Sequence, residues 1–324
     1  MKRVLIAVFS FVQIFAANPP AHLPESEFIY HPLFTGPLLT PETHVVQGGH
    51  VNLEPYVYVN TDYGNYTGNW SYSDTTDTQS VNPLLYTQIG LTSFMDMALT
   101  PQFFTYFSGG ETTTGVGDFE VEFDFQLIAG GGFKQSPSLL FNIGEIFPVS
   151  KYSNLNPSKN GTDAIGSGTY QTTCGFVVGK NFDFGGRHFL ATRYSISYSY
   201  STPVHVKGFN TYGGGNGTDG YVYPGNAFVL LSGFEYSLTR NWVLAIDLQY
   251  QHIDRNRFSG VNGVLANGSE AINSAPSSES FSMAPAIEYN WSETWGLIAG
   301  CWFTIAGRNA SAFASGIVAV NYYK

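Results

Sequence analysis

The feature that most constrains the fold is the stretch GDFEVEFDFQL at residues 117–127, in which polar and apolar side chains alternate. Successive side chains of an extended chain point to opposite faces, so one face of this strand is wholly apolar and the other is acidic. The apolar face carries Phe119, Val121, Phe123, Phe125 and Leu127, and the other carries Asp118, Glu120, Glu122, Asp124 and Gln126. Such a strand must separate an apolar phase from water or from polar partners.

The same period of two recurs along the chain and predicts an all-β protein. Charged residues make up only 12% of the chain and aromatic residues 16%, whereas ordinary soluble domains carry roughly 25% charged residues. The parity of a residue, that is, whether its position along a strand is odd or even, determines which face its side chain occupies. By this criterion the sequence predicts twelve strands, each with one apolar face and one polar or small face. They cover residues 49–60, 84–92, 95–107, 117–127, 138–147, 171–181, 187–201, 227–238, 241–252, 281–290, 295–305 and 312–323.

The connections between these strands alternate in length, with intermediate cases at 108–115, 128–137 and 306–311. An even number of strands, with short turns at one end and long loops at the other, predicts a closed antiparallel transmembrane β-barrel with short periplasmic turns and long extracellular loops. A soluble β-sandwich would bury the apolar faces instead, and the sorting of the long loops favours the barrel. The long polar loops are residues 61–81, 148–170, 202–226 and 253–280, and the short turns are residues 93–94, 239–240 and 291–294.

The N-terminus predicts export. Lys2 and Arg3 precede an uncharged apolar run that ends in small residues, which is typical of a signal peptide spanning residues 1–17. That run is too short to cross a bilayer as a helix, and no later stretch predicts a transmembrane helix. Cleavage would take the formal net charge from −10 to about −12, so nucleic acid is not an expected partner.

Residues 18–47 are rich in proline and histidine and lack alternation. We interpret them as an irregular segment that docks as a plug in the barrel, with a periplasmic extension as the alternative. The barrel itself is expected to span residues 48–324. Cys174 and Cys301 both fall mid-strand, where small buried apolar residues are the expected interpretation, and their spacing predicts no metal site.

Acidic residues on the polar faces of the strands are the candidate lumen residues. One hypothesis is a selectivity path that prefers cations; the alternative is a structural filling in which the acids pair with Arg193, tyrosines and serines. Because seven acids face few bases, we expect cation preference. The lumen candidates are Asp118, Glu120, Glu122, Asp124, Arg193, Glu235, Asp247 and Glu288.

Tryptophan placement indicates one membrane interface. Trp242, Trp291 and Trp295 all lie beside short turns and are the candidates for an aromatic girdle. Trp302 has the parity of the lumen, and Trp70 lies in the first long loop. Seven histidines are present, but none stands in a pattern that a barrel phospholipase would need, so we predict no enzyme, no catalytic residue and no cofactor.

Several short motifs resemble the outer-membrane family of the MetA-pathway of phenol degradation. They are YTQIGLT at residues 86–92, TGVGDFEVE at 114–122, Pro148 after the following strand, and the strand-turn-strand units YSLTRNW at 236–242 and YNWSETW at 289–295. The similarity extends over residues 85–324 and implies a channel for small solutes, with aromatic solutes as one class. It implies no catalytic residues.

Together these features predict a barrel in the outer membrane of a Gram-negative bacterium, in contact with lipid, that acts as a porin for passive uptake of small solutes. The alternative is a plugged surface barrel that serves adhesion or structure through its long loops. The sequence does not predict the oligomeric state.

Overall fold

The structure is a computed structural model that describes residues 31–130, 136–185 and 187–324. The predicted signal peptide, residues 1–17, lies outside the described residues, as do residues 18–30 of the predicted irregular segment. Within the described part of the chain, no helix is both long enough and apolar enough to cross a membrane.

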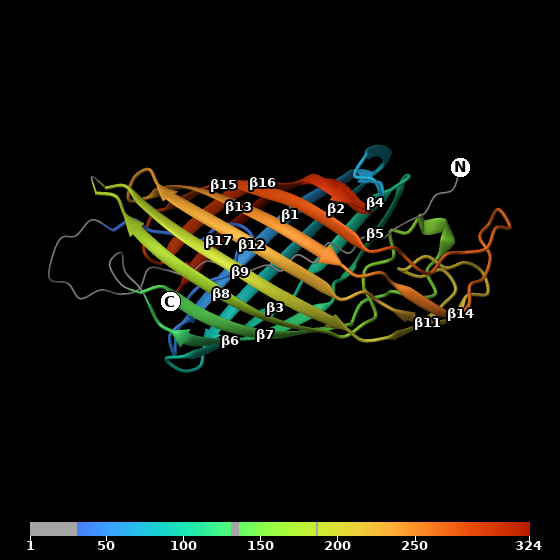
Figure 1. Ribbon diagram of the computed structural model, residues 1–324, viewed down its shortest axis with the longest axis horizontal. Coiled ribbons are helices and arrows are strands. Elements are labelled where there is room, and N and C mark those ends of the chain that lie inside the picture. The colour runs from blue at the N-terminus through green and yellow to red at the C-terminus, as the bar shows by residue number, and fades with distance from the viewer. Residues whose placement is uncertain (1–30, 131–135, 186) are drawn as a thin grey trace.

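The fold is a closed antiparallel β-barrel of twelve strands, as the alternation predicts (Figure 1). The barrel closes because β1 pairs with β17 on one side and with β2 on the other: Val57 lies opposite both Val318 and Pro83. The barrel strands are β1 (Val51–Tyr66), β2 (Tyr72–Gly90), β3 (Met95–Thr100) continued by β4 (Phe103–Ser108), β5 (Glu111–Val116) continued by β6 (Phe119–Ile128), β7 (Ser138–Phe147), β8 (Gln171–Asp183), β9 (Phe189–Ser201), β12 (Ala227–Ser237), β13 (Trp242–Ile253), β15 (Ser278–Asn290), β16 (Trp295–Arg308) and β17 (Ala310–Tyr323).

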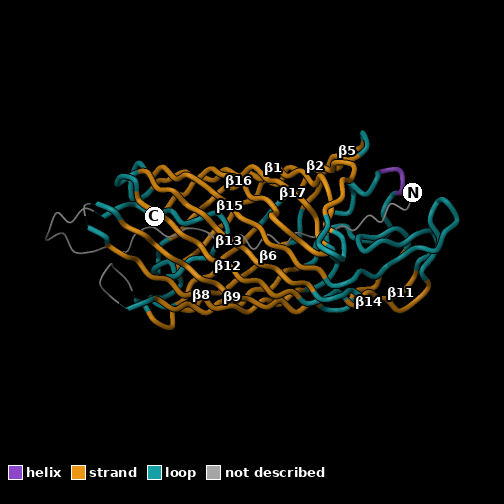
Figure 2. Tube along the Cα trace, turned by 45° about the horizontal axis from the view of Figure 1, so that its top comes forward, coloured by secondary structure: helices purple, strands orange, loops and turns teal. Residues whose placement is uncertain are grey.

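Three of the long loops form a layer at one end of the barrel (Figure 2). They contain a 3-10 turn, η1 (Pro157–Lys159), and a small sheet of β10 (Val204–Lys207), β11 (Asp219–Tyr223) and β14 (Arg257–Val261). Val204, Val206 and Val222 form an apolar cluster within this layer. Burial raises the pKa of the Tyr212 phenol, which donates a 2.8 Å hydrogen bond to the Ser167 carbonyl and joins two of the loops.

Three connections between strands are shorter than the sequence predicts. In each case the strands continue beyond the stretch in which apolar and polar residues alternate. The predicted loop at residues 61–81 is instead the upper part of β1 and β2, with a turn at 67–71 that contains Trp70. Successive residues 72–77 of β2 are all exposed, so neither face is buried here, and the apolar alternation that marks a strand is missing from the sequence. The other two are residues 108–115 and 306–311, which turn at Gly109–Gly110 and at Asn309.

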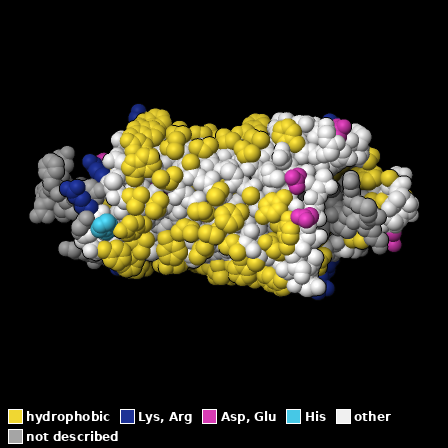
Figure 3. All heavy atoms as spheres, turned by 90° about the horizontal axis from the view of Figure 1, so that it is seen from above, with side chains coloured by type: hydrophobic (Ala, Val, Ile, Leu, Met, Phe, Trp, Pro, Cys, Tyr) yellow, Lys and Arg dark blue, Asp and Glu magenta, His cyan; other side chains and the backbone are white. Residues whose placement is uncertain are grey.

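The two faces of the barrel wall have the polarity of a membrane protein. Along β9, the side chains of Tyr194, Ile196 and Tyr198 are 45–49% exposed, whereas Ser195 and Ser197 between them are buried. A sandwich would show the reverse, so this alternation excludes it. Hydrophobic side chains cover the middle of the barrel in Figure 3, with charged groups toward its ends.

The prediction that Cys174 and Cys301 are buried is wrong. Both are exposed free thiols. Cys174 alternates with buried Thr173, so its parity directs it away from the lumen and toward the outer surface. A small apolar side chain is compatible with a lipid-facing surface as well as with a core.

Leu248, at the middle of β13, is 45% exposed on the outer face and tests the membrane assignment. We expect Leu248→Arg to lower the free energy of unfolding in lipid vesicles by about 2–4 kcal/mol, because it places a cation at the bilayer midplane. Tyr221→Arg in the loop sheet is the control, and it should change stability by less than about 0.5 kcal/mol. Equal effects of the two substitutions would contradict a lipid-facing β13.

Candidate functional site in the barrel lumen

Residues 31–47, which we call the lumen segment, have no regular secondary structure and lie inside the barrel. Leu38 and Leu39 are fully buried in a cluster whose other members come from lumen-facing positions of β1, β2, β3, β12, β15, β16 and β17. Because those strands surround the lumen, contact with all of them places the lumen segment within it. It runs past the same walls that carry the predicted lumen acids.

The backbone of the lumen segment is held by carboxylates of the barrel wall. The amide N–H groups of Leu39 and Thr40 each donate to Asp247, at 3.0 Å and 2.9 Å, and the Thr40 hydroxyl donates to the same carboxylate. Further donors and acceptors are Thr35 N to Glu288 Oε2 at 2.8 Å, Gly36 N to Glu235 Oε1 at 2.8 Å, and Val46 N to Asp96 Oδ2 at 2.5 Å.

This arrangement follows from the hydrogen-bonding needs of the two partners. A buried peptide group without a partner costs free energy, and a segment without helix or sheet cannot supply partners from itself. The backbone of the barrel wall is already paired within the sheet, so only its side chains remain available. A carboxylate can accept several N–H bonds at once, and such charge-assisted bonds are stronger than neutral ones.

Amide side chains complete the attachment at both ends of the segment. Asn290 donates from Nδ2 to the Leu33 carbonyl at 2.9 Å, near the start of the described segment. Gln126 accepts from Val45 N at 3.0 Å and donates to the Thr43 carbonyl at 3.0 Å. These contacts fix the direction of the segment along the lumen.

Glycines in the wall make room for the segment. A Cβ at Gly233 would lie 2.7 Å from Pro37 and 2.8 Å from the Thr40 hydroxyl, which is too close for packed atoms. A Cβ at Gly300 would lie 2.8 Å from Leu38, and it would also lie 2.4 Å from the Pro285 carbonyl of the neighbouring strand. Three more wall glycines lie as closely against the segment, namely Gly90 against Gln47, Gly179 against Thr43 and Gly296 against Thr35. The shape of the barrel wall is therefore complementary to that of the lumen segment.

Arg193 is the one buried lysine or arginine in the described residues. Its guanidinium forms a 3.0 Å ion pair with Glu235, and its other acidic neighbours are Glu42, Asp247 and Glu288. Among the described buried residues of the lumen, the acidic side chains therefore outnumber the basic ones. A buried acid that has lost its partners is costly, so the amide donors of the segment also offset charge that Arg193 alone does not neutralise.

The predicted lumen residues separate into three places. The first group lies on the wall beside residues 35–40 of the lumen segment and consists of Glu235, Asp247, Glu288 and Arg193. Glu122 and Asp124 are buried on the same lumen-facing side of β6, and Glu120 is half-buried. Asp118 lies elsewhere, at the loop end of the barrel, where it accepts hydrogen bonds from Ser150 N, Ser167 N and the Ser167 hydroxyl at 2.8–3.0 Å. Its position is that of a loop anchor.

Three buried acids of the lumen were absent from the sequence-based candidates. Asp96 alternates with Met95 and Met97 and so has lumen parity, a signal that was present in the sequence. Glu54 accepts hydrogen bonds from Asn52, Tyr56 and Asn321 within the wall. Glu42 belongs to the segment itself, where no periodicity could assign it a direction.

The tryptophans of the short-turn end form a continuous aromatic band on the outer surface. Trp242, Trp291 and Trp295 are 41–47% exposed, and the rings of Trp291 and Trp295 stack 6.3 Å apart. Trp302 instead points into the lumen, where its indole N–H donates to the Ser282 hydroxyl at 2.8 Å.

No protein-family profile and no curated protein matches the sequence. Among solved structures, the fold is similar to that of the COG4313 outer membrane channel from Pseudomonas putida F1, with a TM-score of 0.63 and 12% sequence identity, covering 87% of this chain and 98% of that chain. The translocator domain of autotransporter NalP from Neisseria meningitidis gives a TM-score of 0.44 at 14% identity, covering 85% and 89% of the two chains. The first likeness establishes an outer-membrane type of barrel fold; membership of the MetA-pathway family stays a prediction.

Gly233 tests the fit between the wall and the lumen segment. We expect Gly233→Leu to displace the segment, because the new side chain occupies the position of Pro37 and Thr40. Displacement would appear as chymotrypsin cleavage after Leu38 or Leu39, detected by mass spectrometry. Gly316→Leu is the matched control, since a Cβ there meets nothing within 4 Å. Protection from cleavage in both variants would argue against this packing.

Proposed function

We propose that the protein is a gated outer-membrane channel for small solutes, closed by the lumen segment and opened when that segment withdraws. Export by a signal peptide and residence in the outer membrane of a Gram-negative bacterium are parts of the proposal. The likeness of the fold to an outer membrane channel supports it. The site residues give it a mechanism, because the acids of the wall are the contacts that must break.

The observation that carries the proposal is the polarity of the wall beneath the segment. A barrel that served only as a scaffold could fill its lumen with apolar side chains, as small barrels commonly do. Here the wall keeps hydroxyl, amide and carboxylate groups, which water can solvate once the segment leaves. Buried polar residues of the wall include Asn142, Thr173, Ser195, Ser197, Ser199, Asp247, Gln249, Ser282 and Glu288.

The lumen also supports a solute preference. Its acids would attract cations in the open state, in keeping with the expected cation preference. Aromatic rings lie on the same wall: Tyr56 and Tyr58 are buried with their rings 5.8 Å apart, and Trp302 packs edge-on against Phe313 at 4.7 Å. Such rings can stack on a planar solute. We therefore include small aromatic and cationic solutes in the proposed range.

The alternative is a permanently plugged barrel that binds partners through its loops. The exposed Tyr221, Tyr223 and Val261 of the loop sheet favour it, because they present apolar surface to the outside. The aromatic band of Trp242, Trp291 and Trp295 would anchor either kind of barrel at the membrane interface. Conduction by a variant with a loosened segment would separate the two functions.

Asp247 offers the most direct way to loosen the segment, since it accepts three of the segment's hydrogen bonds. A hydrogen bond to a charged group contributes about 1.5–3 kcal/mol. We expect Asp247→Ala to raise the open probability in planar bilayers at least tenfold over the wild-type protein. Asp219→Ala, an exposed loop acid, is the control and should leave conduction at the wild-type level. Silence of Asp247→Ala under all voltages would favour the plugged alternative.

The open channel of Asp247→Ala should still prefer cations, because Asp96, Glu122, Asp124, Glu235 and Glu288 remain in the wall. We expect a reversal potential in a potassium chloride gradient that shows a potassium permeability above that of chloride. Raising the salt concentration should weaken the preference, since salt screens the wall charges. An anion-preferring channel would contradict the role assigned to the lumen acids.

A further inference from the structure

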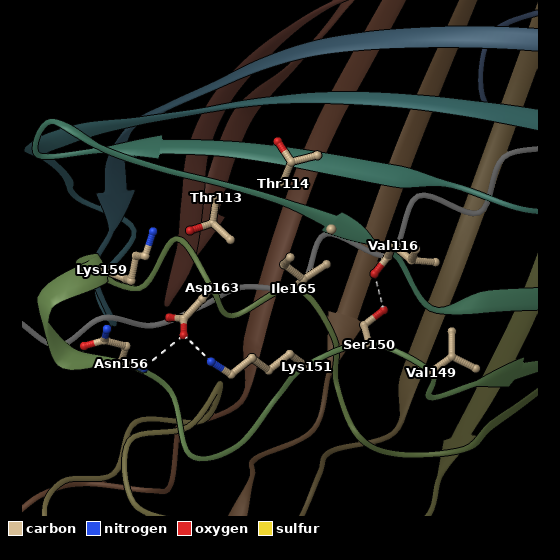
Figure 4. Close-up of a pocket in the computed structure, with 11 residues that line it drawn as sticks. Thr113, Thr114, Val116, Val149, Ser150, Lys151, Asn156, Lys159, Asp163 and Ile165 are labelled. Atoms are coloured by element: carbon tan, nitrogen blue, oxygen red, sulfur yellow. Dashed lines mark hydrogen bonds and ion pairs between the residues drawn. The ribbon is translucent and has the colours of Figure 1, made fainter.

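A cavity of about 420 Å³ lies outside the barrel lumen, at the end that carries the long loops. It opens between the β4–β5 hairpin and the loop at residues 148–170 (Figure 4). Nothing in the proposed channel mechanism uses it. Ser150, on its border, donates from its hydroxyl to the Val116 carbonyl at 2.7 Å and from its amide to Asp118, so the loop side of the cavity is tied to the barrel rim.

One side of the cavity is apolar. Ile165 is buried against the hairpin, at a point where Gly115 lacks a side chain: a Cβ there would lie 2.4 Å from Ile165 Cδ1. Val116 and Val149 line the same cavity and remain 53% and 61% exposed. An engineered cavity of about 150 Å³ is enough to hold benzene. The cavity here therefore has room for a ring or a short aliphatic chain together with a polar group.

The other side of the cavity is basic. Lys151 and Lys159 both line it, together with the single acid Asp163. Asp163 Oδ2 accepts from Lys151 Nζ at 2.6 Å and from Asn156 N at 2.9 Å, which fixes the loop. Among the residues that the structure describes, Lys159 Nζ has only a long contact, 3.5 Å to the Thr112 carbonyl. The lining thus carries one more positive than negative charge, in a chain whose formal net charge is −10.

We propose that this cavity captures small organic acids that have an apolar body. The carboxylate would lie between the ammonium groups of Lys151 and Lys159, and the body would pack on Ile165, Val116 and Val149. A surplus of one positive charge matches a monoanion, and the apolar wall disfavours inorganic phosphate and acidic sugars, whose polar groups would lose water there. Capture at this position raises the concentration of such acids near the loop end of the barrel.

Calorimetric titration of the full-length protein in detergent tests the site with three probes. Benzoate carries both features, acetate lacks the apolar body, and benzamide lacks the charge. We expect saturable binding of benzoate at one site and at least tenfold weaker binding of acetate and of benzamide. Absence of benzoate binding, or equal affinity for benzoate and benzamide, would overturn the proposal. Binding is measured without conduction, so it can fail or succeed independently of the channel function.

A pair of lysine variants assigns the binding to the cavity. Lys159→Gln should weaken benzoate binding at least fivefold. Lys180→Gln removes the same charge near the opposite end of β8 and should keep the wild-type affinity. Heat-modified migration on gels would verify that both variants retain the barrel. Equal affinity of Lys159→Gln and the wild-type protein would overturn the site, and equal weakening of both variants would show a general charge effect instead.

Discussion

The interaction on which the rest of the structure depends is the hydrogen bonding of an irregular backbone by carboxylates inside a closed sheet. In a barrel, every wall peptide group is paired with a neighbouring strand, so a chain that enters the lumen finds side chains as its partners. Asp247 alone accepts from Leu39 N, Thr40 N and the Thr40 hydroxyl. Four of the acids that the alternating strands direct inward are thereby attachment points of the segment, namely Asp96, Glu235, Asp247 and Glu288.

These contacts give the acidic residues of the lumen a structural role in addition to the role in ion selectivity that the sequence predicts. Free carboxylates in a pore would act on passing ions, whereas those of Asp96, Glu235, Asp247 and Glu288 accept hydrogen bonds from the protein's own backbone. The two roles are compatible, because the same groups become available to solutes if the segment leaves. Wall glycines such as Gly233 and Gly300 indicate that the occupied lumen is a packed state with complementary shape.

The alternation of apolar and polar residues predicted the barrel well, because each strand that crosses a lipid bilayer must direct apolar side chains to the lipid and polar ones to the lumen. The lumen positions of Glu235, Asp247, Glu288 and Arg193 followed from parity alone. Outside the membrane that constraint ends, and the sequence pattern no longer identifies strands. It predicts a loop at residues 61–81, although β1 and β2 continue through much of this stretch as a hairpin. The sequence cannot separate a buried from a lipid-facing position for Cys174, because both kinds of position favour a small apolar side chain.

The partners of the lumen acids could not be predicted from the strands. Residues 31–47 have no periodicity, so their path depends on contacts with residues far away along the chain, from 50 positions for Val46 with Asp96 to 253 positions for Thr35 with Glu288. Hydrogen–deuterium exchange of the full-length protein in lipid nanodiscs tests this path most directly. We expect the amides of Leu39 and Thr40 to exchange as slowly as those of the barrel strands. Exchange at the rate of an unstructured chain would contradict a lumen segment held by carboxylates.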